Sequence, residues 1–560
     1  MFSRINLIFI HGNRRFSTSL RAMSLNYKAS NEPGLTFEAG TKERQQLEAK
    51  LQEYENKEFD IPIVIGDSEI RTQDVHYQVR PFDHKKTLCK FSYADKKLIQ
   101  EAIHTSQQVR AEWERRPLEQ RAEIFLRAAD LVAGKYRMDL LAATMLGQAK
   151  TIVQAEIDSA QELADFYRFN VAHASELMKY QPISTETETN RLYLRGMEGF
   201  WAAITPFNFT AIGGHLCAAP ALMGNVVLWK PSDTSMLSNY LVFTLLREAG
   251  IPPGVINFVP ADGPTFGNVI TSSPLLAGIN FTGSVKTFKT LWKLVAQNID
   301  NYKSYPRLIG ECGGKNYHLV HPSAEVPSVV VGTIKSAFEY SGQKCSACSR
   351  IYAPKSLWPQ IKQGLTETVE QMKLGSPLEV DSYLSAVIDD KAFDRIKGYL
   401  DHIKSSPNLS LVTGGNCDNS KGYFVQPTIC ETTDPYDKIM QEEIFGPVLT
   451  VYVYDDKDFD AVVDMVNETS PFGLTGSIFA KDRSVIESVS EKLRQTAGNF
   501  YINDKSTGSV VGQQPFGGAR ASGTNDKAGG PHYLLKFVSP QSIKETKVPL
   551  TSWSYPYMNN

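Results

Sequence analysis

The sequence predicts an α/β protein built from two packed units, each with a largely parallel sheet and crossover helices. Short β-type runs alternate with helical runs in two regions, residues 200–310 and 316–503. This alternation favours parallel sheets that bind ligands at the carboxyl ends of their strands. The length of 560 residues also exceeds the usual size of one domain. We therefore expect two α/β units that pack directly, with a cleft between them.

The composition favours a soluble globular protein over a nucleic-acid-binding or membrane-spanning one. Hydrophobic residues make up 42% of the chain, charged residues 21%, and the net charge is −2. These values are typical of a soluble globular protein and give no basic excess for binding nucleic acid. The longest apolar stretch, residues 211–229, is interrupted by His215, Pro220 and Asn225, so we expect buried core and no membrane span. Seven scattered cysteines predict free thiols in a reducing compartment.

The N-terminal segment has the composition of a mitochondrial transit peptide. The first 31 residues contain five Arg and Lys residues, several Ser and Thr residues, and no acidic residue before Glu32. A cationic, acid-poor segment of this kind suits import into mitochondria. We therefore assign residues 1–24 to a transit peptide and expect the protein in the mitochondrial matrix. A disordered N-terminal tail is the alternative.

Several elements are expected outside the two alternating regions. Residues 42–57 predict a charged helix, residues 61–70 a short strand with a turn, and residues 96–180 a series of helices. Residues 185–205 alternate polar and apolar side chains, which predicts a hairpin with one exposed arm. The aromatic tail from residue 527 is too apolar to remain in water. It docks either on a neighbouring subunit or on its own chain.

The alternating regions give the expected strands of the two sheets. In the first region they are residues 199–205, 225–231, 255–260 and 278–284, with a helix at 238–250. In the second region they are residues 316–322, 349–354, 448–454, 475–480 and 499–503. The residues that follow these strands are candidates for a ligand site, because parallel strands end at one edge of a sheet.

The stretch GQKCSACSR, residues 342–350, contains Cys345 and Cys348 three positions apart. A metal site would need a second cysteine or histidine pair, and a redox pair usually opens a helix early in a small domain. A buried inert thiol is the stronger alternative, since free cysteines are among the most buried residues. Cys345 follows Gly342, which permits a tight turn, and Lys344, whose charge would lower the pKa of a thiol.

Two other residues make Cys345 a candidate nucleophile. Glu311 precedes Gly313 and Gly314, which allow a close approach of the backbone, and Asn208 lies between two aromatic residues after a predicted strand. A thiolate, a carboxylate and an amide can supply a nucleophile, a base that activates water and a donor to an oxyanion.

Seven motifs together resemble the aldehyde dehydrogenase family in their order and spacing. They are PFNF (206–209), NVVLWKPSD (225–233), FTGS (281–284), ECGGK (311–315), GQKC (342–345), EEIFGPV (442–448) and PFGG (515–518). The resemblance implies that Cys345 attacks an aldehyde and that the Asn208 amide and the Cys345 N–H hold the oxyanion. It also implies that Glu311 helps water to cleave the resulting thioester. Cys348 becomes a bystander with a packing role.

The resemblance also implies a fold and a cofactor. It predicts a Rossmann-like NAD-binding domain (25–182 and 199–312), an α/β catalytic domain (313–526) and a small β oligomerisation flap with a tail (183–198 and 527–560), in at least a homodimer. No Gly-x-Gly-x-x-Gly follows the strands, and the residues alone do not separate NAD from NADP, so NAD is chosen on the subgroup resemblance. The implied cofactor-binding residues are Thr205, Lys230, Gly283, Ser284, Val285, Lys286, Thr287, Glu443 and Phe445. Ser284 also suits a helix N-cap.

Residues 338–350 and 500–533 resemble one subgroup, the Δ1-pyrroline-5-carboxylate dehydrogenases, which oxidise glutamate γ-semialdehyde in proline breakdown. Their amino-acid substrate needs donors for its carboxylate at a fixed distance from the sulfur. The implied substrate-binding residues are Phe209, Lys344, Ser346, Gly508, Ser509 and Phe516. Core packing is the alternative for the two phenylalanines, and a loop turn for Ser509.

From the subgroup resemblance we expect a stand-alone mitochondrial enzyme without a proline-oxidising domain. Another semialdehyde or betaine-type aldehyde dehydrogenase and a non-catalytic protein on the same scaffold are the competing readings. The joint presence of Cys345, Glu311 and Asn208 argues against the non-catalytic protein.

Overall fold

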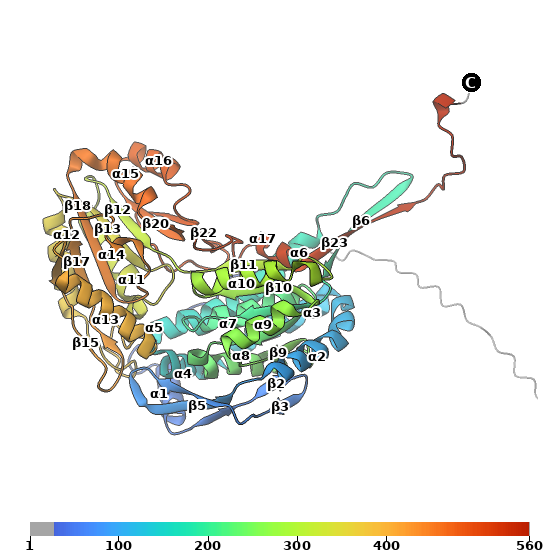
Figure 1. The fold of residues 1–560 in the computed structure, drawn as a ribbon, viewed down its shortest axis with the longest axis horizontal. Helices are drawn as coiled ribbons and strands as arrows, with labels where there is room; N and C mark the ends of the chain where they lie inside the picture. The colour runs from blue at the N-terminus through green and yellow to red at the C-terminus, as the bar shows by residue number, and fades with distance from the viewer. Residues whose placement is uncertain (1–26, 559–560) are drawn as a thin grey trace, which may run out of the picture.

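The computed structural model describes residues 27–558. Two seven-stranded sheets dominate it, and helices cover both (Figure 1). The predicted α/β class is therefore confirmed. The predicted transit peptide, residues 1–24, lies outside the described residues.

The first sheet has the strand order β11-β10-β7-β8-β9-β2-β3. Strands β11 to β9 are parallel, whereas β2 and β3 are antiparallel to their neighbours. Trp201 and Trp229 from adjacent strands are fully buried. The strands are β2 (Ile63–Ile65), β3 (Ser68–Ile70), β7 (Phe200–Ile204), β8 (Val226–Lys230), β9 (Ile256–Phe258), β10 (Leu276–Thr282) and β11 (Arg307–Glu311), and the helices between them are α7 (Thr210–Leu222), α8 (Met236–Ala249), α9 (Gly263–Ser272) and α10 (Val285–Gln297).

The second sheet has the order β14-β17-β18-β13-β12-β20-β21 and is parallel except for its edge strand β14. The strands are β12 (Asn316–Val320), β13 (Cys348–Pro354), β14 (Leu409–Thr413), β17 (Thr428–Thr432), β18 (Val448–Tyr454), β20 (Thr475–Phe479) and β21 (Asn499–Ile502). Its helices are α11 (Val326–Phe338), α12 (Trp358–Gln371), α13 (Asp390–Ser405), α14 (Lys438–Gln441), α15 (Phe459–Glu468) and α16 (Arg483–Lys492). The strands predicted in both regions are confirmed. The domain division itself stays a prediction.

The N-terminal region adds a helical layer and a three-stranded sheet, β1-β5-β4. Its elements are β1 (Phe59–Ile61), β4 (Val75–Arg80), β5 (Asp83–Ser92), α1 (Lys42–Glu55), α2 (Lys96–Arg115), α3 (Leu118–Ala133), α4 (Arg137–Gln148), α5 (Ile152–Ala155), the π-helix η1 (Glu156–Glu162) and α6 (Leu163–Met178). The predicted charged helix and helical series are therefore confirmed. Helices α3, α4 and α6 bury apolar faces in the same core as α7 and α8.

The remaining elements are short. They are the strand pairs β15 (Cys417–Asp418) with β16 (Phe424–Val425) and β19 (Phe472–Gly473) with β22 (Ala519–Arg520), the helix α17 (Pro531–Leu534), and the 3-10 helices η2 (Asp233–Ser235), η3 (Ile299–Asn301), η4 (Glu339–Gly342), η5 (Asp456–Asp458), η6 (Leu535–Phe537) and η7 (Pro556–Met558). Of these, η4 leads into the loop that contains Cys345.

The predicted hairpin over residues 185–205 is wrong. Strand β6 (Glu188–Gly196) pairs antiparallel with β23 (Val538–Thr546), while β7 enters the first sheet. The alternating pattern therefore covers two strands that belong to different sheets. The ribbon of β6 and β23 extends away from the body of the molecule (Figure 1). The tail thus docks on its own chain through β23, but Leu550 and Trp553 beyond it are 94% and 85% exposed.

Two predictions from composition are also confirmed. The apolar stretch 211–229 forms most of α7 and β8 and is buried in the first unit. All seven cysteines are free thiols. Within residues 27–558 no helix combines the length and apolar character required to cross a membrane.

Candidate functional site

The loop around Cys345 has an unusual backbone. Tyr340, Ser341 and Gly342 are all left-handed, with φ of 53°, 53° and 69°. Left-handed conformations in non-glycine residues are uncommon and tend to occur at functional sites. Asn316, which begins β12, donates its Nδ2 to the carbonyls of Cys345 at 2.7 Å and Ala347 at 2.8 Å. The second sheet therefore fixes the loop that presents the thiol.

The three candidate catalytic side chains converge on this loop. Asn208 follows β7 and donates its Nδ2 to the carbonyl of Gln343 at 3.1 Å. Glu311 ends β11, and its Oε2 accepts from the N–H of Gly518 at 3.3 Å. Its charge contributes to the raised pKa of Cys345, so the carboxylate and the thiol interact. An amide and an acid from the first sheet thus meet a thiol from the second.

The sequence predicts a lowered pKa for the Cys345 thiol, and the structure shows the opposite. Lys344 was expected to lower the thiol pKa, but its Nζ pairs with Glu339 at 2.9 Å. Burial raises the pKa of Cys345, and the negative charges of Glu311 and Glu443 raise it further. The prediction for Lys344 is therefore wrong. A neutral thiol needs a nearby base to become a nucleophile. Glu311 is the candidate for this base, and burial raises its pKa well above the usual value.

Cys348 is in a different environment. It begins β13, is 2% exposed, and its Sγ donates to the carbonyl of Arg350 at 3.5 Å. Burial raises the pKa of Cys348 to about 12. Burial raises the pKa of Cys345 as well, so the two thiols differ in access: Cys345 is partly exposed and Cys348 is buried. A thiol that an aldehyde cannot reach supports the prediction of a packing role.

The candidate cofactor residues of the first sheet lie at the carboxyl ends of three adjacent parallel strands. Thr205 follows β7, Lys230 ends β8, and Gly283 follows β10. The N–H of Thr205 donates to the carbonyl of Lys230 at 3.1 Å, and that of Gly283 donates to the carbonyl of Glu311 at 3.1 Å. Burial lowers the pKa of Lys230. The residues therefore form one continuous edge, which leads to Glu311.

Helix α10 begins at this edge. Ser284 is its N-cap and accepts from the N–H of Thr287 at 3.2 Å. Val285 and Lys286 form the first turn, which is partly exposed. A helix N-terminus at the end of a parallel strand favours a phosphate group through its N–H groups and dipole. The edge therefore suits the pyrophosphate of a dinucleotide.

Glu443 and Phe445 approach from the second unit. The N–H of Gly314 donates to Oε1 of Glu443 at 2.9 Å, and burial raises the pKa of this glutamate to about 7. The rings of Phe445 and Phe207 pack edge to face, 5.9 Å apart. Gly314, Glu443 and Phe445 line a small cavity beside the loop of Cys345. Glu443 and Phe445 therefore remain candidates for contacts with a cofactor ring.

The candidate substrate residues differ in how close they lie to the loop of the nucleophile and in which groups they contact. The hydroxyls of Ser346 and Thr507 are 2.7 Å apart, which brings Gly508 and Ser509 next to the loop of the nucleophile. Lys344 instead pairs with Glu339, as described above. The ring of Phe209 lies 4.1 Å from the Nζ of Lys150. Phe516 is half-buried, and its N–H donates to the carbonyl of Ala528 at 2.9 Å.

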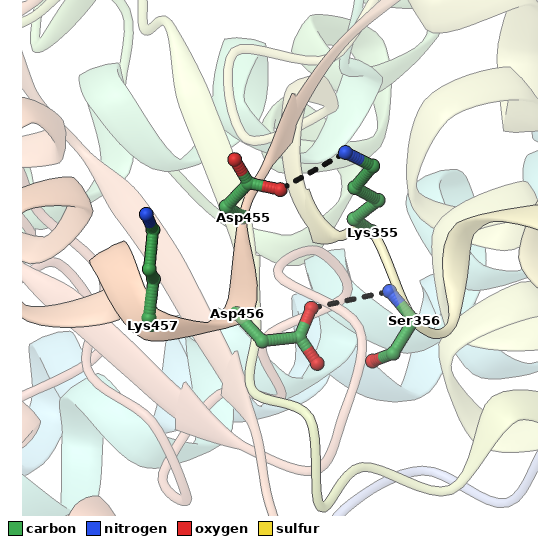
Figure 2. A pocket seen from close by; sticks show the side chains of 5 residues that line it. All are labelled: Lys355, Ser356, Asp455, Asp456 and Lys457. Carbon is green, nitrogen blue, oxygen red and sulfur yellow. Dashed lines mark hydrogen bonds and ion pairs between the residues drawn. The ribbon is translucent and has the colours of Figure 1, made fainter.

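A separate depression lies where β13 and β18 end, and it has none of this chemistry (Figure 2). Lys355 pairs with Asp455 at 3.1 Å, and the N–H of Ser356 donates to Asp456 at 3.1 Å. Both members of the ion pair are at least half exposed. The depression therefore consists of two surface turns, and no cysteine is among the described residues that line it.

The sequence profile of the aldehyde dehydrogenase family matches residues 70–543. The chain belongs to the aldehyde dehydrogenase family. This confirms the predicted family and fold, and all seven motifs lie within the matched residues.

Individual relatives of this aldehyde dehydrogenase are similar over nearly the whole chain. The mitochondrial delta-1-pyrroline-5-carboxylate dehydrogenase of Danio rerio is 61% identical over 95% of this chain and 96% of that protein. The Homo sapiens protein of the same name is 59% identical over 95% and 94%. The crystal structure of the delta-pyrroline-5-carboxylate dehydrogenase from Mycobacterium tuberculosis bound with NAD matches with a TM-score of 0.92 and 43% identity, over 95% of this chain and 98% of that one.

Sequence reasoning missed a buried ion pair beneath the site of this aldehyde dehydrogenase. Lys150 and Asp158 are fully buried and 2.8 Å apart. Asp158 also accepts from the N–H groups at the start of α7, and Lys150 lies 4.6 Å from the ring of Tyr340. The pair thus supports both Phe209, the N-cap of α7, and the nucleophile loop. The sequence feature that could have indicated this pair is the presence of charged residues inside an otherwise apolar helical run.

Glu162 was missed as well. Burial and the neighbouring charge of Asp158 raise its pKa to about 8, and its charge in turn raises the pKa of Cys345. A carboxyl group at the end of the π-helix therefore contributes to the electrostatic setting of the thiol. The π-helix that places it has no clear sequence pattern.

The buried pair gives a stability prediction. The Asp158→Ala variant is expected to lose about 3 kcal/mol of unfolding free energy, because Lys150 would remain as an unpaired buried charge. Urea denaturation and the melting temperature measure the loss.

The matched control is Asp381→Ala. Asp381 also pairs with a lysine at 2.8 Å, but its side chain is 68% exposed. Exposed ion pairs contribute little to stability, so this variant should have the same melting temperature as the parent. Equal melting temperatures for the Asp158 variant and the control would contradict a structural role of the buried pair.

Proposed function

We propose that this aldehyde dehydrogenase oxidises L-glutamate γ-semialdehyde, the open form of Δ1-pyrroline-5-carboxylate, to L-glutamate. The observation that supports the chemistry is the meeting of Cys345, Asn208 and Glu311 from two sheets in one place. The relatives that match nearly the whole chain support the substrate. The reaction is a step of proline catabolism and uses NAD.

Cys345 is the nucleophile. Its thiol gives up a proton to a base, for which Glu311 is suited by its raised pKa and its interaction with the thiol. The sulfur then bonds to the aldehyde carbon and forms a thiohemiacetal. The Asn208 amide and the N–H of Cys345 donate to the oxyanion, which stabilises the charge that develops on this oxygen.

The second half of the reaction cleaves a thioester. When NAD is bound, its nicotinamide ring supplies the acceptor for the hydride of the aldehyde carbon. Glu311 first releases to solvent the proton that it took from the thiol. It then removes a proton from water, the water oxygen bonds to the carbonyl carbon, and the C–S bond breaks. The departing thiolate of Cys345 takes this proton back from Glu311, and glutamate leaves after its new carboxyl group loses a proton to solvent.

The chain offers a suitable binding edge for NAD. The N-terminus of α10, with Gly283, Ser284, Val285, Lys286 and Thr287, would hold the pyrophosphate through backbone N–H groups. Thr205 and Lys230 would contact the adenosine ribose, and Glu443 and Phe445 the nicotinamide side. Their positions at adjacent strand ends and beside the thiol support these roles.

Recognition of the far end of the substrate falls to the residues near Thr507. Gly508 and Ser509 would donate to the α-carboxylate, and Ser346 holds their loop at a fixed distance from Cys345. Phe209 and Phe516 would pack on the aliphatic part. Lys344 can act on the carboxylate only through its long-range charge while it pairs with Glu339.

Location and assembly complete the proposal. The protein acts in the mitochondrial matrix, as the names of its relatives and the cationic N-terminal segment support. The extended ribbon of β6 and β23 and the apolar tail beyond it support a homodimer that covers them. Residues 25–182 and 199–312 would form the NAD-binding domain, and residues 313–526 the catalytic domain.

A comparison of substrates tests the function. The kcat/KM for glutamate γ-semialdehyde should exceed that for simple aliphatic aldehydes by about a hundredfold or more, because only the semialdehyde satisfies the carboxylate donors. NADH formation measures both rates. A preference for succinic semialdehyde or an aliphatic aldehyde would assign the chain to another subgroup.

A further inference from the structure

The first described residues of the chain connect helix α6 with a loop of the proposed substrate site. Residues 27–35, which we term the strap, lie against helix α6 and against residues 506–514, which we term the carboxylate loop because Gly508 and Ser509 lie within it. These segments are about as far apart in sequence as the chain allows, since one contact joins residues separated by 480 positions. The strap therefore connects the N-terminus to a loop of the proposed substrate site.

Asn31 makes this connection with a single side chain. Its Nδ2 donates to Oδ2 of Asp165 on α6 at 2.7 Å and to the carbonyl of Val511 at 2.8 Å. Its Oδ1 accepts from Nε2 of Gln513 at 2.9 Å. Both N–H groups and the oxygen of the amide are thus engaged. A side chain that is bonded in this way fixes the distance between α6 and the carboxylate loop.

The strap is itself held firmly. The backbone N–H of Glu32 donates to Oδ1 of Asp165 at 2.6 Å. The carboxylate of Glu32 pairs with Arg137 at 2.9 Å and with Arg168 at 2.6 Å. Arg137 is 6% exposed, so part of this network is buried. Partly buried, charge-assisted bonds of this kind are stronger than those of exposed pairs. Asn31 therefore extends from a fixed base.

The other end of the carboxylate loop is fixed separately. The hydroxyls of Thr507 and Ser346 are 2.7 Å apart, and Ser346 follows the nucleophile. Gly508 and Ser509 lie between this contact and the contacts of Asn31 with Val511 and Gln513. Beyond them, Gly512 lies against α6, where a Cβ would come within 2.1 Å of the Phe169 ring. The loop is thus held on both sides of its two candidate donors.

We propose that Asn31 is a positioning residue for substrate specificity, which holds Gly508 and Ser509 at the distance from Cys345 that a glutamate-length aldehyde requires. This inference rests on the proposed function, because it assigns the substrate carboxylate to the same loop. The strap acts on this binding step and leaves the chemistry at Cys345 and the NAD edge unchanged. A segment close to the end of the predicted transit peptide thereby becomes part of the specificity of the enzyme.

The test is the Asn31→Ala variant of the full chain, measured in two ways. Its KM for glutamate γ-semialdehyde should rise about tenfold, since three hydrogen bonds that hold the donors are lost. Its kcat, its KM for NAD and its kcat/KM for propionaldehyde, which has no carboxylate, should stay within about twofold of the parent. Hydrogen exchange of the amides in residues 508–514 should become about fivefold faster.

The matched control is Asn56→Ala. The Asn56 side chain also bonds a backbone carbonyl, that of Gln52 at 2.9 Å, but at the exposed end of α1. This variant should match the parent in every measurement. Unchanged exchange and an unchanged KM in Asn31→Ala would overturn the proposal, and so would an equal loss with both aldehydes. A parent enzyme that prefers propionaldehyde would instead refute the proposed substrate, and the exchange of residues 508–514 would still decide whether Asn31 positions the loop.

Discussion

NADH formation by a Cys345→Ala variant is expected to fall by a factor on the order of 10⁵, because no other group in the site can form the covalent intermediate. The methyl group of alanine fits the space of the thiol. The hydrogen bond from Asn316 to residue 345 goes to its backbone carbonyl, so the substitution keeps this bond. The loop should therefore keep its shape. NAD binding, followed by fluorescence or calorimetry, should stay within about threefold of the parent.

Cys348→Ala is the matched control. It removes a thiol three positions away that is 2% exposed, so its cost should be a loss of packing of about 1–2 kcal/mol in stability with kcat retained. If the Cys345→Ala variant still formed NADH, or if the Cys348→Ala variant did not, Cys345 would not be the nucleophile.

The candidate catalytic residues could be selected from the sequence because each lies close to a strand with a strong local pattern. Asn208 follows β7 and Glu311 ends β11, and the carboxyl ends of parallel strands gather at one edge of a sheet. Cys345 precedes β13 in the other sheet, so the strand pattern alone did not connect it with them. The motifs then assigned a role to each residue. The sequence did not reveal the direction of the Lys344 side chain. A neighbouring cation suggested a lowered thiol pKa, but the ammonium pairs with Glu339 and burial dominates.

The errors and omissions concern contacts between distant segments. The alternating pattern of residues 185–205 describes strands correctly but contains no information on their partners, so β23 could not be foreseen as the partner of β6. The hydrogen bonds of Asn31 to Val511 and Gln513 also join segments that are far apart in the sequence, so no local pattern predicts them. Lys150 and Asp158 are closer in sequence, but the π-helix between Glu156 and Glu162 interrupts the helical period that would predict their geometry.

Glu311→Gln should slow steady-state NADH formation by about 10²- to 10⁴-fold, because the site would lose the base that activates water. Glutamine keeps the shape of the side chain and can still accept from the N–H of Gly518, as the carboxylate does at 3.3 Å. Stopped-flow measurement of NADH and mass spectrometry of the acyl-enzyme separate the two proton transfers assigned to Glu311. Thioester that accumulates on Cys345 shows that water activation is the slowed step, and a lack of thioester shows that deprotonation of the thiol is. Retention of more than about a tenth of the parental rate would exclude Glu311 as the base.

The pH dependence of stability provides an independent check on Glu311. Burial raises its pKa above the usual 4.5, so the folded state holds the proton more tightly than the unfolded state. As the pH rises from the unfolded pKa towards the folded one, the unfolded chain loses its proton first, and this group makes the protein less stable. Glutamine has no such proton, so Glu311→Gln should melt at or above the parental temperature at neutral pH. The exposed control Glu487→Gln, which loses only an i,i+4 pair with Arg483, should match the parent in both rate and melting temperature. If Glu311→Gln melted well below both proteins, its low activity would reflect a damaged fold and would not identify a missing base.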